Sequence, residues 1–391
     1  MWRRLLDFIS SLKLTIICLS LAIILVFVGT LAQVNFGIHE VQQRYFQSLF
    51  VWWPEGSGGF KIPVFPGGHL LGGVLLLNLL AAHIRRFQWT WRKLGIQLAH
   101  AGLIVMLAGA LFTDLFSVES FMRLAPGETK NYSEDSRAVE LAVINESDKD
   151  QDRVTAIPEE WLKNGKPIEH ASLPFRIIVR HFYQNSRLQP LEKAGPNAVP
   201  AATQGVGARV AVAEVPRATA ENERDLVSVV IEVAPSPGDK APAGPTGTWL
   251  VSDQLGAPQS FSYGGMTWRL VMRQARYYKP YSLTLKKFTH ESYAGTGIAK
   301  NFASSATLTD PEHNENRDVL IYMNHPLRYR GETFFQSGFE ANDTATVLQV
   351  VYNPSFVAPY LACVIVSVGL IFQFAYHFAG FLRRRKSPSA P

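Results

Sequence analysis

The sequence predicts an integral membrane α-helical protein with four transmembrane helices and a large extracytoplasmic all-β, sandwich-like domain inserted between helices three and four. Three observations favour this fold class. The apolar residues fall in four long blocks, and charged residues make up only 18% of the chain, below the roughly 25% of soluble domains. The basic residues cluster beside those blocks. At 391 residues, the chain is long enough for a further folded domain outside the membrane.

Each apolar block is long enough for a transmembrane helix, which needs about 20 residues to cross roughly 30 Å of hydrocarbon. We therefore divide the chain into transmembrane helix 1 in residues 1–33, an outer amphipathic, interfacial loop in 34–66, helix 2 in 67–86, a cytoplasmic loop in 87–93, helix 3 in 94–116, the β-rich domain in 117–354, helix 4 in 355–382 and a basic cytoplasmic tail in 383–391. A cleaved signal peptide is the alternative for the first block. Its apolar run of about 19 residues, however, exceeds the usual signal core.

The basic residues predict the direction in which the chain crosses the membrane, because Lys and Arg stay on the cytoplasmic side. They form three clusters: Arg3, Arg4 and Lys13; Arg85, Arg86, Arg92 and Lys93; and Arg383, Arg384, Arg385 and Lys386. All three fit a topology with both termini in the cytoplasm and the 117–354 domain outside. No transit peptide is visible, so we expect a bacterial cytoplasmic (inner) membrane, with the large domain on the periplasmic side.

The interfacial loop and the large domain differ in pattern. Residues 41–53 are amphipathic and end in Trp52 and Trp53, and tryptophan favours the headgroup layer. The large domain instead has β-branched runs of period two, bounded by Gly, Pro and Asp, which predict an antiparallel sandwich or a pair of sheets. The clearest runs are residues 175–180, 226–233, 267–272, 282–286 and 346–352.

Composition and motifs exclude several classes of function. The two cysteines exclude a disulfide scaffold, and without Cys-x-x-Cys-His the chain is not itself a c-type cytochrome. No hydrolase, phosphate-loop or zinc-protease motif is present. The net charge of +6 does not indicate nucleic-acid binding, because the basic excess lies beside the membrane spans and no basic face with interleaved aromatics exists elsewhere.

Histidines in the spans are the main candidate site residues. His100 lies six residues inside helix 3, about 9 Å deep, where polar side chains are rare and usually functional. A neutral imidazole is an axial ligand for haem iron, so His100 is a candidate metal ligand. His83 and His377 lie near the same level, and Arg85, Arg86 and Arg92 are placed to pair with haem propionates.

Each of these residues also has a structural interpretation. His100 could form an interhelical hydrogen bond, whereas His83 and His377 could extend towards the headgroups. The arginines could serve topology and lipid contact alone. His69, at the outer end of helix 2, is a weaker candidate for an outer haem contact.

Helix 3 also carries a stripe of small residues that allows close packing against another helix. The stripe consists of Ala99, Gly102, Met106, Gly109 and Thr113.

Several motifs together resemble one known family. The second half of the chain contains Lys279-Pro-Tyr-Ser-Leu, Gly297-Ile-Ala-Lys-Asn-Phe and, most specifically, Asn324-His-Pro-Leu-Arg-Tyr-Arg-Gly. The spans add Ser11-Leu-Lys-Leu-Thr, Gly29-Thr-Leu, Asn78-Leu-Leu and His100-Ala-Gly-Leu-Ile-Val-Met. These motifs, with the number and order of spans, resemble the ResB family, also called CcsB. Residues from about 130 to 260 carry no matching motif.

The resemblance implies a subunit of a System II cytochrome c synthase. Such a subunit works with a ResC/CcsA-type, Trp-rich membrane protein to carry haem b across the membrane and attach it to Cys-x-x-Cys-His of apocytochrome c. It implies that His100 is an axial ligand of the haem iron, with the second ligand and the outer histidines supplied by the partner. Thiol-reducing, thioredoxin-like proteins are a further partner class. No activity is expected from the chain alone, and Trp52-Trp53 does not match the partner's Trp-rich motif.

Two other functions remain open. The chain could be a membrane-anchored structural or binding module with a β-sandwich head and no haem. It could also be a b-type haem redox subunit that uses two of His83, His100 and His377 as a ligand pair. A transporter is disfavoured, because Asp114 is the only acidic residue within the four apolar runs, the first of which is residues 14–32, and no inverted repeat is visible.

Overall fold

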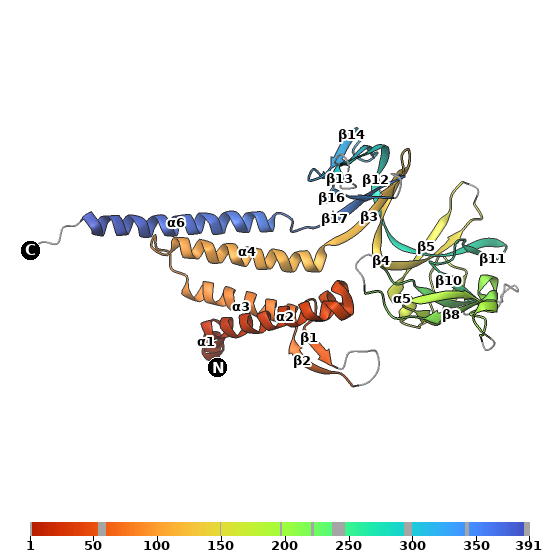
Figure 1. The fold of residues 1–391 in the computed structure, drawn as a ribbon, viewed down its shortest axis with the longest axis horizontal. Coiled ribbons are helices and arrows are strands. Elements are labelled where there is room, and N and C mark those ends of the chain that lie inside the picture. Colours follow the sequence, from red (N-terminus) through yellow and green to blue (C-terminus); the bar gives the residue numbers. More distant parts are fainter. Residues whose placement is uncertain are drawn as a thin grey trace, which may run out of the picture. The chain divides into compact units, whose positions relative to one another are not determined.

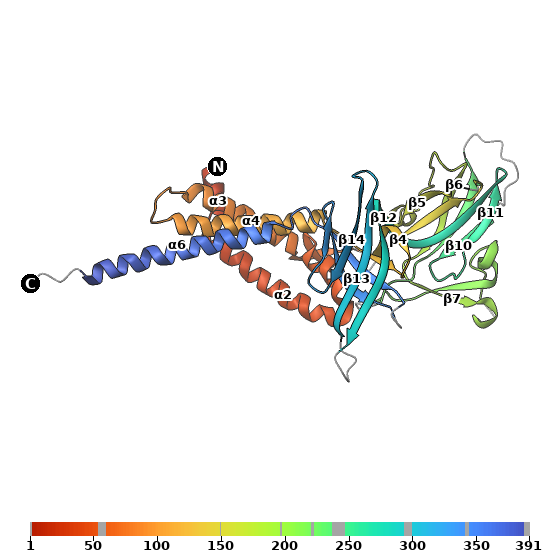
Figure 2. The same ribbon diagram turned by 90° about the horizontal axis from the view of Figure 1, so that it is seen from above.

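The computed structural model describes residues 2–53, 60–148, 150–195, 198–219, 223–236, 247–292, 299–340 and 344–386. These residues form two compact units (Figures 1 and 2). The helical unit contains residues 1–118 and 352–391, and the β unit contains residues 119–351. The end of the predicted 383–391 tail and the first residues of the Gly297 motif lie outside the described residues.

Four helices of the helical unit are long and apolar enough to cross a membrane. They are α2 (Leu12–Val41), α3 (Gly68–Arg86), α4 (Leu94–Phe116) and α6 (Ala358–Lys386). The predicted class, a multi-pass membrane protein with a β-rich domain between its third and fourth spans, is therefore confirmed. The side of the membrane on which the β unit stands remains a prediction.

The structure differs from the prediction at the N-terminus. A short helix, α1 (Trp2–Ile9), precedes α2. The helical conformation is interrupted between them, because Ser11 is the N-cap of α2 and its side chain accepts a hydrogen bond from the Leu14 amide at 3.2 Å. Helix α2 then extends to Val41, well beyond the predicted end of the span at residue 33. It is interrupted at Gly37, whose φ of 74° suits a residue without a Cβ.

Residues 34–66, predicted as a loop, are largely ordered into regular structure. After α2 come a π-helical turn, η1 (Gln42–Phe46), and the antiparallel strands β1 (Phe50–Trp53) and β2 (Ile62–Pro66). These elements fold back on the helices, because Val41, Tyr45 and Val51 form one buried cluster with Leu25 and Leu71. Trp52 and Trp53 stay exposed, and their place at a membrane surface remains a prediction.

Helices α4 and α6 pack side by side in both views (Figures 1 and 2). Glycines on α4 permit this approach. A Cβ on Gly95 would lie 2.5 Å from the Gly369 carbonyl oxygen, and one on Gly102 would lie 2.5 Å from Cγ2 of Val366. Thr113, at the end of the same face, shares a hydrogen bond of 2.8 Å with Ser355. The predicted packing is thereby confirmed for Gly102, Gly109 and Thr113, whereas Met106 of the same predicted stripe lines a pocket on another side of α4.

The β unit is built mainly from one large sheet. Its strands are β3 (Val118–Leu124), β4 (Thr129–Asn145), β5 (Arg153–Pro158), β11 (Gln259–Tyr263), β12 (Met266–Ser292), β13 (Ala299–Asp310), β14 (Glu315–Tyr322), β15 (Leu327–Tyr329), β16 (Glu332–Phe339) and β17 (Thr346–Tyr352). The strand order is β14-β13-β12-β4-β3-β17-β16-β15, with β5 paired to β4 and β11 paired to β12.

Smaller sheets complete the unit. Strands β6 (Phe175–Tyr183), β9 (Ser228–Pro235) and β10 (Gly247–Ser252) form a three-stranded sheet, and β7 (Ser186–Pro190) pairs with β8 (Val210–Glu214). The remaining elements are the short helices α5 (Glu159–Lys163), η2 (Leu191–Lys193) and η3 (Gly205–Arg209). Four of the five predicted strand runs lie within strands, and the fifth, residues 226–233, begins two residues before β9, so the prediction of a β-rich domain is confirmed.

Strand β12 passes through two separate hydrophobic cores. Its first half contributes Trp268 to the core between the three-stranded sheet and the large sheet, where Phe175 meets the indole ring edge-on with centroids 5.0 Å apart. Its second half contributes Leu283 to a core with Phe334. Between the halves, pairing with β4 is interrupted near Pro280, since proline has no amide proton to donate. The two runs predicted as separate strands are therefore one strand.

We expect Gly102→Ala to weaken the packing of α4 against α6. An added methyl group normally favours a helix by up to about 1 kcal/mol, but here it would overlap Val366 and cost about 1–3 kcal/mol as overpacking does. The midpoint of thermal unfolding of the detergent-solubilised chain should fall. Gly380→Ala on α6 is the matched control, because a Cβ there meets no described atom within 4 Å. Equal midpoints for the two variants would contradict the packing argument.

Candidate functional site

Two of the three candidate histidines face each other in the helical unit. His83 lies near the end of α3 and His100 near the start of α4. Because a short turn reverses the chain between these helices, residues on either side of it come to the same level. The two imidazole centroids are 6.4 Å apart, with an angle of 34° between the ring planes.

The hydrogen bond that His100 makes determines which of its nitrogens can bind a ligand. Nδ1 lies 2.7 Å from the carbonyl oxygen of Ile96, one turn earlier in α4. A carbonyl oxygen only accepts, so Nδ1 carries the proton. In the neutral ring, Nε2 therefore presents a lone pair. Histidines that bind metals are commonly oriented by the same kind of Nδ1–H bond to a backbone carbonyl.

Both rings line a pocket of about 600 Å³ between α2, α3 and α4, within the range of small-molecule sites. Leucines from the three helices form its walls, and Arg86 and Lys93 add positive charge. The complete lining is Ser10, Leu12, Thr15, Leu19, Leu75, Asn78, Leu79, Ala82, His83, Arg86, Lys93, Ile96, Gln97, His100, Leu103, Met106 and Leu107. An apolar slot with two imidazoles and two cations suits a flat, metal-bearing dianion.

Two of the arginine candidates have different environments. Arg86 lines the pocket and donates to the carbonyl oxygen of Ser10 at 3.3 Å. Arg85 forms an ion pair with Asp7 of α1 and lies 3.4 Å from the Ser10 hydroxyl. It is not among the residues that line the pocket. Arg85 therefore ties α1 to α3, and Arg86 is the arginine that a pocket ligand would meet.

His377 does not join the other two histidines. It lies exposed on α6, where its Nε2 is 2.6 Å from the side-chain amide nitrogen of Gln373 on the same helix. It is not one of the described residues that line the pocket at His83 and His100. Helix α6 packs on the glycine face of α4, and His100 lies on another face of that helix. His377 is predicted to lie at a membrane depth similar to that of His100, but the packing of α6 keeps it away from the pocket.

Asn78 is a site residue whose role the sequence analysis missed. It is only 3% exposed, and its Oδ1 accepts from Thr15 Oγ1 at 2.7 Å. Its Nδ2 donates to the carbonyl oxygens of Ile9 and Ser11, at 2.5 Å and 3.1 Å. These bonds hold the α1–α2 junction against α3 beside the pocket. The available signal was a lone amide in the middle of an apolar span.

A second pocket, of about 540 Å³, adjoins the first along α3 and α4. His69 Nε2 donates a hydrogen bond to Asp114 there, and Gln47 donates to the other carboxylate oxygen at 2.9 Å. The lining is Gln33, Ile38, Gln42, Phe46, Gln47, Gly68, His69, Gly72, Gly73, Leu76, Leu107, Ala110, Leu111 and Asp114. Leu107 lines both pockets.

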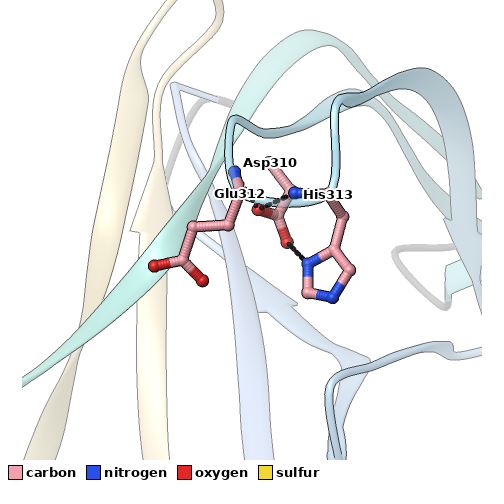
Figure 3. A group of neighbouring side chains, drawn as sticks. All are labelled: Asp310, Glu312 and His313. Carbon is pink, nitrogen blue, oxygen red and sulfur yellow. Dashed lines mark hydrogen bonds and ion pairs between the residues drawn. The ribbon is translucent and has the colours of Figure 1, made fainter.

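In the β unit, one group of side chains has the spacing of a metal site: Asp310, Glu312 and His313 (Figure 3). Arg330 already supplies the positive charge that an ion would bring. Its Nε lies 2.8 Å from Asp310 and its Nη1 lies 2.8 Å from Glu312. We therefore interpret this group as structural.

The same arginine lies in the Asn324–Gly331 motif, which forms a tight hairpin. Arg330 and Gly331 have φ values of 46° and 80° between the paired residues Tyr329 and Glu332, the pattern of a type I′ turn. Tyr329 donates to Asp310 at 2.7 Å, and this bond raises the pKa of Tyr329 to about 12. Burial opposes ionisation of Asp310, but the Tyr329 bond and the charge of Arg330 lower its pKa overall.

Glu332, the residue after the turn, connects this hairpin to the Lys279–Pro–Tyr281 motif. Its carboxylate accepts from Lys279 at 2.5 Å and from the hydroxyl of Tyr281. Lys279 and Tyr281 are buried, and burial together with the Glu332 bond raises the pKa of Tyr281 well above its usual value. The Lys279–Pro–Tyr281 and Asn324–Gly331 motifs thus form one packed structure within the second core.

These features define a class of protein: a multi-pass membrane protein with a histidine-containing, mainly apolar pocket between its spans and a β-rich domain before the last one. Comparison with known proteins gives matches to part of the chain. Residues 259–347 match the ResB-like family. Over 94 residues, the chain is 30% identical to Protein NrfI of Wolinella succinogenes, an alignment that covers 24% of this chain and 10% of that protein. The chain thus spans about a tenth of the length of this curated relative. The predicted resemblance to the ResB/CcsB family is confirmed, and it is carried by β11 to β17.

We expect Asn78→Ala to destabilise the α1–α2 junction, because it leaves two carbonyl oxygens and one hydroxyl without their present partner. Unsatisfied buried groups cost about 1–3 kcal/mol. Limited proteolysis should cut the chain faster near Ser10, and the unfolding midpoint should fall. Thr30→Val is the control, since it removes one exposed bond within a single helix. Unchanged proteolysis at Ser10 would contradict this role.

We expect Arg330→Gly to lower the stability of the β unit, although glycine relieves a positive φ that is unfavourable for arginine. The loss of its ion pairs to Asp310 and Glu312 should outweigh that relief. Near-ultraviolet circular dichroism during heating would measure the effect. Asn314→Gly, at a φ of 51°, is the control and should leave the transition unchanged. A higher transition temperature for Arg330→Gly would show that backbone strain dominates.

Proposed function

We propose that this chain is a haem-handling subunit in cytochrome c biogenesis. It would receive haem in the pocket between α2, α3 and α4, with Nε2 of His100 as an axial ligand of the iron. The observation that carries this proposal is the bond from His100 Nδ1 to the Ile96 carbonyl oxygen, which leaves Nε2 available beside an apolar cavity. The match of residues 259–347 to the ResB-like family supports the same role.

The residues of the pocket fit haem as a cargo. Imidazole nitrogen is a ligand of haem iron, and leucine side chains suit the faces of the porphyrin. Arg86 and Lys93 line the pocket near the turn between α3 and α4, where they would pair with the two propionates. Haem is made in the cytoplasm, so the positive-inside topology would place this end of the pocket on the side of supply.

The chain would act by placement. Haem supplies the vinyl groups that react with the cysteine thiols of Cys-x-x-Cys-His in apocytochrome c, and the protein binds and orients it. A ResC/CcsA-type membrane protein would supply the second axial ligand and receive the haem. The β unit would stand on the periplasmic side of a bacterial inner membrane, where it would hold the partner or the apocytochrome. Thioredoxin-like proteins would keep the substrate thiols reduced.

One observation favours a second candidate function. His83 and His100 lie close together, with ring centroids 6.4 Å apart, whereas His377 is not part of this pair. A ligand pair within the chain is what a b-type haem redox subunit requires. Such a subunit would bind haem without a partner, and this property separates it from the first proposal.

Haem spectra of the purified chain test both functions. We expect a b-type spectrum that depends on the ResC/CcsA-type partner, and a loss of haem affinity in His100→Ala of at least about tenfold, as removal of metal-site residues typically causes. His377→Ala is the matched control and should retain haem. Haem held by the chain alone and lost in both His83→Ala and His100→Ala would favour the redox subunit. If no preparation contains haem, the result would favour a membrane-anchored structural or binding module.

A further inference from the structure

Helices α3 and α4 carry polar groups at two levels. His83 faces His100 at one level, and His69 meets Asp114 at the other. On each helix the two groups are 14 residues apart, or about 21 Å at 1.5 Å per residue. Antiparallel helices with equal spacing bring each pair together at one end of the same face.

The two pockets adjoin each other. Leu107 lines both, so the cavity at His69 lies next to the cavity at His83 and His100 on the same face of α3 and α4. Gly72 and Gly73 line the cavity at His69, and a Cβ on either one would meet no described atom within 4 Å. Such glycines leave one wall of this cavity without side chains, which makes room for a flat ligand.

The present partner of His69 occupies the nitrogen that a porphyrin iron would need. Its Nε2 is bound to Asp114, whose other oxygen accepts from Gln47. The other ring nitrogen, Nδ1, is adjacent to the side chain's own Cβ attachment, so a wide macrocycle cannot approach it closely. Nε2 can serve Asp114 or iron, but not both at once. Gln33 and Gln42, in the same lining, carry amide donors suited to carboxylates.

We propose that the His69–Asp114 pocket is a second haem site, reached from the first along the face between α3 and α4, and that Asp114 releases His69 when iron binds. The inference rests on the proposed function, since it takes the same ligand class. It adds His69 as an iron ligand, a second binding position at the other end of α3, and Asp114 as a carboxylate that competes with the iron for His69. His69 would bind the iron through the lone pair of Nε2, with the ring proton moved to Nδ1, and Asp114 then keeps its bond to Gln47.

Haem titration of the full chain tests the site. In a His83→Ala/His100→Ala background, the first pocket has no imidazole, and added ferric haem should still give a saturable Soret shift. His69→Gln keeps a hydrogen-bond donor for Asp114, so the helices stay joined, and it should weaken binding about tenfold or more. His39→Ala, a histidine outside the pocket lining, is the matched control and should leave the titration unchanged.

Two further variants test the open space at Gly73 and the competition. Asp114→Ala should tighten haem binding by about tenfold, the equivalent of one charge-assisted hydrogen bond. Gly73→Leu places a side chain in open space and should weaken this site without affecting the signal that depends on His100. A titration that His69→Gln leaves unchanged, including simple uptake of haem by micelles, would overturn the inference. It would not affect the proposed function, which fails instead if His100→Ala, made in a His69→Gln background that removes the second site, retains haem as the His69→Gln chain does.

Discussion

The close approach of α4 to α6 is the constraint on which the membrane part of the structure depends. Backbone meets backbone along Gly95, Gly102 and Gly369, where even a methyl group would overlap its neighbour. This contact fixes one face of α4 and leaves its other side free to form cavities with α2 and α3. The polar residues of α4, His100 and Asp114, line these cavities. Tight packing on one face and open space on another thus have a common origin in the glycine spacing.

Local patterns predicted the spans, the small-residue face and the period-two strands, because each depends on neighbours a few residues apart. Contacts between distant segments were not predictable in this way. The pairing of His83 with His100 requires the antiparallel arrangement of α3 and α4, and the isolation of His377 depends on which face α6 presents. The continuity of β12 through two cores was hidden by Pro280, which resembles a strand boundary when only the sequence is read.

The motifs that carry the family resemblance serve structure more than chemistry. Lys279 and Tyr281 share the carboxylate of Glu332, and Arg330 neutralises Asp310 and Glu312. The partners lie about 20 positions apart for Arg330 and about 50 for Glu332, and they become contacts only when β12, β13 and β16 align. The match of residues 259–347 to the ResB-like family therefore reflects similarity in the residues that build this β core. The pocket residues lie elsewhere in the chain, in the helical unit.

The bond between His100 and Ile96 has one further consequence. Donor and acceptor belong to the same helix turn, so the choice of tautomer does not depend on α2, α3 or any other subunit. Rotation about the side chain is therefore restricted within α4 itself, so the metal site proposed above would lose less side-chain entropy on binding. The Nε2 lone pair keeps its direction relative to α4 wherever the neighbouring helices lie.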